Sequence, residues 1–112
     1  MYGIEVRGFG VGLLVELCGE FDVFCIEELK RILSDASSYL GPVLVDLSEI
    51  TFLDLRSARE LAVRSMLSPH RPTFVDPSPQ VMATMSALGL EGWPDALPGV
   101  GRGGPQVFSG VS

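Results

Sequence analysis

Residues 43–68 read VLVDLSEITFLDLRSARELAVRSMLS, and this stretch decides the fold. It begins with a β-branched and leucine run, Val43–Leu47, whose only charge is Asp46. A second apolar step, Phe52–Leu53, precedes Asp54, after which apolar residues recur at helical spacing. The pattern predicts a buried strand that leads into a helix N-terminus. Backbone N–H groups at such a terminus are unpaired and carry the positive end of the helix dipole, so functional residues are expected there.

The composition predicts one globular domain. The chain has 112 residues, of which 46% are hydrophobic, enough for a core without disulfide or metal staples. A formal net charge of −6 argues against nucleic acid as a partner. The sequence contains no run of eighteen apolar residues, so no membrane span is predicted. The N-terminal residues MYGIEVRG do not resemble a signal peptide, and we therefore expect a cytoplasmic protein.

Cysteine and histidine are scarce. Cys18 and Cys25 lie seven residues apart without a CxxC motif, which favours two buried thiols, with a redox pair as the alternative. The single histidine, His70, has no Cys-His grouping around it. We therefore expect no metal site and no cofactor.

Alternating strand and helix patterns continue along the chain. The expected strands are residues 3–7, 11–18, 43–47 and 73–76, and the expected helices are residues 26–40, 55–67 and 79–88. The order β-β-α-β-α-β-α predicts an α/β domain at residues 1–97, with a mixed, mainly parallel sheet of four to five strands packed with three to four helices. The first strand should lie antiparallel at one margin. Residues 98–112, rich in Gly, Pro and Ser, are expected to form a flexible tail.

Three segments resemble the STAS domains, the family of anti-sigma factor antagonists. They are DLSEITFLD at residues 46–54, LCGEFDVFCIEELKRIL at residues 17–33 and FVDPSPQVMATMSALGLEGW at residues 74–93. The usual family signature is D-L-S-x-V-x-F-x-D-S-S-G-L, and its Ser-Ser-Gly is replaced here by Leu55-Arg56-Ser57. The resemblance implies a non-enzymatic regulatory module, a monomer or weak dimer, that binds an anti-sigma factor of the serine-kinase type.

The first helical turn after the central strand carries the main candidates. Asp54 is expected to cap the helix. The resemblance implies that Arg56 takes the position of the serine that the family's kinase phosphorylates, and an arginine cannot accept that phosphate. Ser57 is an alternative phosphorylation site, but it lies ~100° further round the helix, where we expect its hydroxyl to bond locally to the backbone.

The resemblance places the partner surface at this helix and the loop before it. The predicted partner-binding residues are Asp22, Phe24, Ser48, Glu49, Asp54, Arg56, Ser57, Arg59 and Glu60. No catalytic residue is predicted, because the chain has no nucleophile elbow and no acidic pair for a receiver-type phosphoacceptor. The alternative function is a STAS accessory or ligand- or nucleotide-binding module of a transporter or signalling complex, although no GxxxxGK[ST] motif is present.

Overall fold

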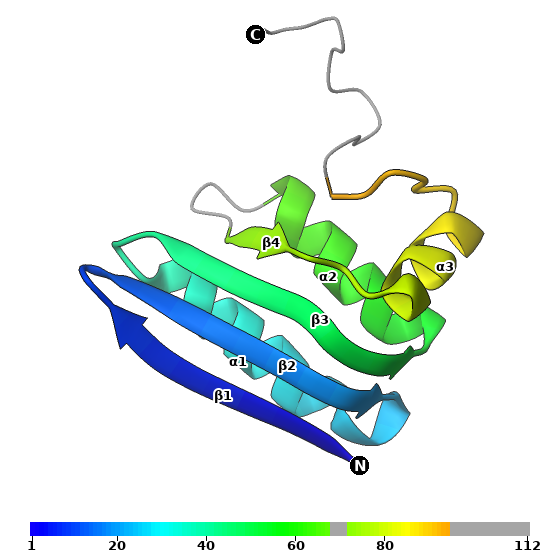
Figure 1. Ribbon diagram of the computed structural model, residues 1–112, viewed down its shortest axis with the longest axis horizontal. Coiled ribbons are helices and arrows are strands. Elements are labelled where there is room, and N and C mark those ends of the chain that lie inside the picture. Colours follow the sequence, from blue (N-terminus) through cyan, green and yellow to red (C-terminus); the bar gives the residue numbers. More distant parts are fainter. Residues whose placement is uncertain (68–71, 95–112) are drawn as a thin grey trace, which may run out of the picture.

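The computed structural model describes residues 1–67 and 72–94, and Figure 1 shows their arrangement. Along the chain the elements are β1 (Tyr2–Phe9), β2 (Gly12–Phe21), the 3-10 helix η1 (Val23–Cys25), α1 (Ile26–Ser38), β3 (Val43–Leu53), α2 (Leu55–Leu67), β4 (Thr73–Val75) and α3 (Pro79–Ala87). The predicted α/β order is confirmed. The expected tail at residues 98–112 and His70 lie outside the described residues.

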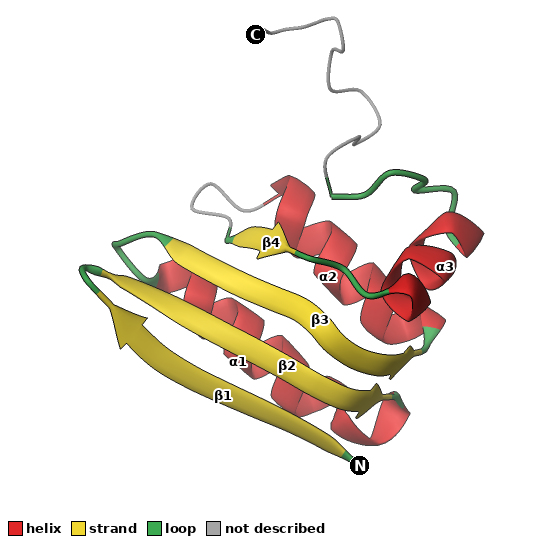
Figure 2. Ribbon diagram, viewed as in Figure 1, coloured by secondary structure: helices red, strands yellow, loops and turns green. Residues whose placement is uncertain are grey.

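The sheet of the described residues has four strands in the order β1-β2-β3-β4. β1 runs antiparallel to β2, whereas β3 is parallel to both β2 and β4, which confirms the mixed sheet with an antiparallel margin strand. Figure 2 shows α1 and α2 behind the same face of this sheet. Leu29 and Leu33 of α1 and Leu61 of α2 are fully buried in the core together with Val45 and Leu47 of β3. The central strand is therefore covered where its sequence is most apolar.

β3 continues to Leu53, so the expected end of this strand at residue 47 is wrong. Its pairing with β2 shifts register twice, between Glu16 and Cys18 and between Gly19 and Glu20 of β2. At each shift β3 has one more residue than β2. From the first shift onward the buried positions of β3 lie three residues apart, at Leu47, Ile50 and Leu53. The alternation that identifies a strand in a sequence is lost there.

β2 is also longer than expected, because residues 19–21 extend the strand to Phe21. Gly19 has a φ of +88° and lies so close to the N-terminal residue that an added Cβ would sit 2.3 Å from the Met1 carbonyl oxygen. Glycine is the residue that tolerates both conditions. A sequence pattern that treats glycine as a turn signal therefore ends this strand too early.

α3 closes the edge of β3 beyond the short strand β4, which pairs only with residues 44–46. The Ser78 backbone N–H donates to the Leu47 carbonyl at 3.3 Å, and the Ser78 hydroxyl donates to the Ile50 carbonyl at 2.7 Å. The Thr84 hydroxyl donates to the Leu53 carbonyl at 3.0 Å. Two side chains and one amide thus occupy carbonyl groups that a further strand would need, and they hold α3 beside the end of β3.

Candidate functional site

Asp54 ties the end of β3 to the start of α2. Its side chain accepts a hydrogen bond from the Ser57 backbone N–H at 2.8 Å, which is the geometry of a helix N-cap. Its own backbone N–H donates to the Phe21 carbonyl at 3.0 Å, which joins this turn to the end of β2. A cap of this kind stabilises a protein by ~1 kcal/mol. The first turn of α2 is therefore held firmly in place.

Arg56 and Ser57 point to opposite environments. Arg56 is exposed, and within residues 1–67 and 72–94 it forms no ion pair. Ser57 is 0% exposed, and its hydroxyl has no hydrogen-bond partner in the described part of the chain, so the expected local bond to the backbone is wrong. The outward position on this turn thus carries a guanidinium, while the hydroxyl faces the core.

An open groove of about 830 Å³ lies between the start of α2, the end of β3 and α3, and we call it the α2–α3 groove. Exposed apolar side chains line it, with Phe52 44% and Leu55 52% accessible. Leu55 is the first residue of α2 and is exposed, although helical spacing aligns it with the buried Ala58. Arg56 and Arg59 supply the positive charge of the groove.

The fold of this chain matches two solved structures. The anti-sigma factor antagonist SpoIIAA in its unphosphorylated form superposes with a TM-score of 0.63 at 18% identity, over 81% of this chain and 84% of that one. An anti-sigma factor antagonist from Mycobacterium paratuberculosis superposes with a TM-score of 0.67 at 20% identity, over 80% of each chain. The chain has the STAS fold. Identities of this size establish the fold alone, and one fold can carry different functions.

No protein-family model and no curated protein sequence matches the chain significantly. The match to this fold therefore comes from the three-dimensional arrangement, to which the sequence adds the resemblance of three segments. Among the helices of the described residues, none is long and apolar enough to cross a membrane. These residues also contain no cluster of three or more His, Cys, Asp or Glu side chains placed to hold a metal ion.

The STAS fold distributes the predicted site residues unevenly. Asp54, Arg56 and Arg59 line the α2–α3 groove together. The remaining predicted residues do not line it: Ser48, Glu49 and Phe24 are exposed, Asp22 and Glu60 are half-buried, and Ser57 is buried. The structure therefore brings three of the predicted residues, Asp54, Arg56 and Arg59, together at the groove and leaves the others outside it.

Sequence reasoning missed the apolar part of the groove. Val23, Phe52, Leu55, Ala83 and Ala87 all line it, from four different elements. The only local signals were Phe52 and Leu55, apolar residues on either side of the capping aspartate. Nothing in the sequence indicates that α3 faces the start of α2, because that proximity follows from the closure of the β3 edge. The groove offers apolar surface and guanidinium groups, which suit binding.

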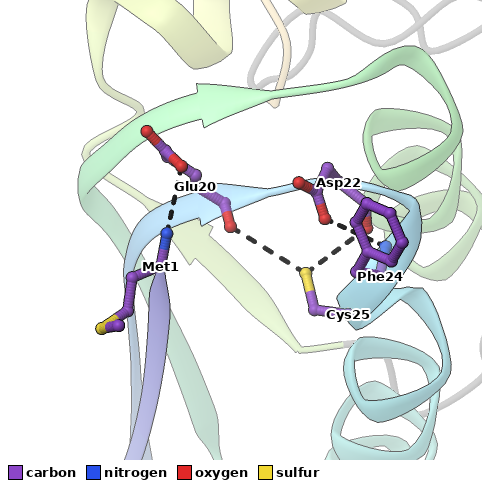
Figure 3. A network of polar contacts seen from close by, with 5 residues as sticks. All are labelled: Met1, Glu20, Asp22, Phe24 and Cys25. Carbon is purple, nitrogen blue, oxygen red and sulfur yellow. Dashed lines mark hydrogen bonds and ion pairs between the residues drawn. The ribbon is translucent and has the colours of Figure 1, made fainter.

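A polar network at the start of α1 lies next to Val23, which lines the α2–α3 groove, and Figure 3 shows this network. The Asp22 side chain accepts a hydrogen bond from the Phe24 N–H at 2.9 Å and caps η1. The Cys25 thiol is buried and donates to the Asp22 carbonyl at 3.4 Å. The N-terminal ammonium pairs with Glu20 at 3.0 Å. These contacts hold the turn that leaves Phe24 92% exposed.

The two cysteines differ, and the expectation that both are buried is wrong for Cys18. Cys18 pairs with Gly3 of β1 and is exposed, because it alternates with the buried Leu17 and so points away from the core. Burial raises the pKa of the Cys25 thiol, which lowers the fraction of reactive thiolate.

We expect Ellman's reagent to modify one thiol per folded chain within minutes and the second only after denaturation. Cys18→Ser should abolish the fast reaction, whereas Cys25→Ser should retain it. Fast labelling of the Cys18→Ser protein would contradict the buried position of Cys25.

Proposed function

We propose that this chain is a regulatory protein-binding module that sequesters an anti-sigma factor of the serine-kinase type. Its docking surface is formed by the end of β3 and the first turns of α2, and it works without the serine phosphorylation switch. The observation that carries the proposal is the exposed Arg56 beside a buried Ser57. The resemblance to the family implies that Arg56 stands where its members carry the phosphorylated serine. The proposal includes a cytoplasmic protein, a monomer or weak dimer, with its domain at residues 1–97.

The chemistry of these two side chains supports an unswitched surface. A phosphoserine adds about −1.5 to −2 charges and disrupts a fitted surface by repulsion and desolvation. A guanidinium cannot be phosphorylated by a serine kinase, and its positive charge is permanent. The neighbouring Ser57 hydroxyl is 0% exposed beneath a turn held by the Asp54 cap, so a kinase would have to open that turn first. Binding should therefore persist when the partner has ATP.

The test compares the native chain with Arg56→Ser for binding to a candidate kinase-type anti-sigma factor, with and without ATP. Native binding should not change when ATP is added, whereas the serine variant should be phosphorylated and lose binding at least tenfold. Arg56→Ala is the matched control, since it removes the guanidinium without supplying a hydroxyl. Equal loss of native binding with ATP, or phosphate on Ser57 in the mass spectrum, would refute the proposal.

A nucleotide-binding accessory module is the second candidate. Arg56 and Arg59 near a helix N-terminus favour an anion, and the groove volume of about 830 Å³ lies in the range of small-ligand sites. Calorimetry with ATP and GTP alone separates the candidates. Micromolar binding of free nucleotide that Arg56→Ala abolishes would favour the second one.

A further inference from the structure

The α2–α3 groove carries positive charge that the protein itself does not neutralise. The chain has a formal net charge of −6, and Arg7 and Arg31 each form two ion pairs with neighbouring carboxylates. Arg56 and Arg59 form none within residues 1–67 and 72–94. The one acidic residue that lines the groove, Asp54, caps α2. The two guanidinium groups are therefore available to carboxylates of a partner.

The same groove exposes apolar surface beside these arginines. Phe52 and Leu55 are about half accessible, and Val23 is 47% accessible. The facing side of α3 contributes Ala83 and Ala87, one turn apart, whose small side chains leave the groove open. Aromatic and arginine side chains together are the composition that protein interfaces favour. An occupant of this groove should present both apolar groups and negative charge.

The occupant of the groove cannot pair its main chain with the edge of β3. A peptide that adds a strand to a sheet needs free carbonyl and amide groups along the edge. At the edge of β3 beside the groove, the carbonyls of Leu47, Ile50 and Leu53 already accept hydrogen bonds from Ser78 and Thr84. The occupant must therefore bind through side chains, as an amphipathic helix does when it lies in a groove.

We propose that the α2–α3 groove binds an acidic amphipathic helix. Its apolar stripe packs on Phe52 and Leu55 between α2 and α3, and carboxylates beside that stripe pair with Arg56 and Arg59. The inference deepens the proposed function and rests on it, in that the helix belongs to the anti-sigma partner. It adds to the proposed function the kind of structural element, an acidic amphipathic helix, through which the partner binds.

The probe is a synthetic helical peptide of roughly 15 residues, long enough for four turns, with leucines at i, i+3, i+4 and i+7 and glutamates beside them. A second peptide carries lysine in place of every glutamate, and a third carries serine in place of every leucine. Fluorescence anisotropy should show binding of the acidic peptide alone. Nitrogen-15 chemical shifts should change at residues 52–59 and 80–87. Binding should weaken as salt is added, because the arginines are exposed.

Charge reversal supplies the decisive comparison. Arg56→Glu with Arg59→Glu should weaken the acidic peptide at least tenfold and create binding of the lysine peptide. Arg31→Glu, a single charge reversal at an exposed arginine on α1, is the control outside the groove and should leave binding of the acidic peptide unchanged. Equal binding of both charged peptides, shifts outside the groove, or binding lost only when residues 95–112 are deleted would overturn the proposal. So would self-association at the groove, seen as a concentration-dependent mass.

Failure of this inference is separable from failure of the proposed function. If the anti-sigma factor binds at α2 but the double charge reversal leaves its affinity unchanged, the acidic helix is excluded while the regulatory role stands. If the acidic peptide binds the groove and no anti-sigma factor does, the groove chemistry stands and the assigned partner falls.

Discussion

Replacing Phe21 with alanine is expected to lower the free energy of unfolding by about 3–5 kcal/mol, the range for buried aromatic residues. Phe21 is 0% exposed at the end of β2, and the centroid of its ring lies 5.5 Å from the centroid of the Tyr2 ring. Removal of the ring leaves a cavity beside the turn whose backbone positions Asp54. Small domains have total stabilities of about 5–15 kcal/mol, so this loss is a large part of the whole. Urea denaturation followed by circular dichroism measures it.

Phe24→Ala is the matched control for Phe21→Ala. The two phenylalanines lie three residues apart, but Phe24 is 92% exposed, so its removal should change the free energy of unfolding by less than about 0.5 kcal/mol. The contrast tests where the chain turns from β2 into α1. Similar losses for the two variants would show that the end of β2 is packed differently.

Replacing Ser57 with aspartate, the usual mimic of phosphoserine, is expected to destabilise the fold by about 3 kcal/mol or more. A buried charge without a partner costs several kcal/mol. The helix dipole returns only ~0.3–1 kcal/mol at an exposed first turn and up to ~2 kcal/mol in partly buried geometries, so desolvation dominates. Ser57→Asn has similar size without the charge and isolates the electrostatic part. Ser57→Ala should be neutral or stabilising, because the native hydroxyl has no partner among the described residues.

The free energy of unfolding of the Ser57→Asp variant should depend on pH in a direction that burial of the new carboxyl determines. Burial raises the pKa of the introduced carboxyl above its ordinary ~3.9, so between these two values the folded state binds more protons than the unfolded state. The free energy of unfolding should then fall as pH rises from about 4 through the raised pKa, relative to the native chain. Arg56→Asp, one residue earlier and exposed, should show no such fall. Thermal melts of both variants across pH 3.5–8 decide between them, and an equal pH dependence would contradict the burial of Ser57.

Several features of this protein follow from its sequence alone. The order of strands and helices, the bounds of α2 at Leu55–Leu67 and the capping position of Asp54 are local properties. They depend on apolar spacing and on the hydrogen bonds of one turn, which neighbouring residues determine. The resemblance to the family signature, with Arg56 in place of one of its serines, is read from the sequence in the same way.

Other features were decided only by tertiary structure. β3 extends past Leu47 because its pairing with β2 absorbs two register shifts, and no local pattern reports a pairing partner. Ser57 is buried although its neighbours Leu55 and Arg56 are exposed, because α2 lies against the sheet on that one side. The α2–α3 groove exists because Ser78 and Thr84 hold α3 against the edge of β3, some thirty residues away in the chain. Spacing within a segment encodes which face is apolar, but contacts between distant segments determine what that face meets.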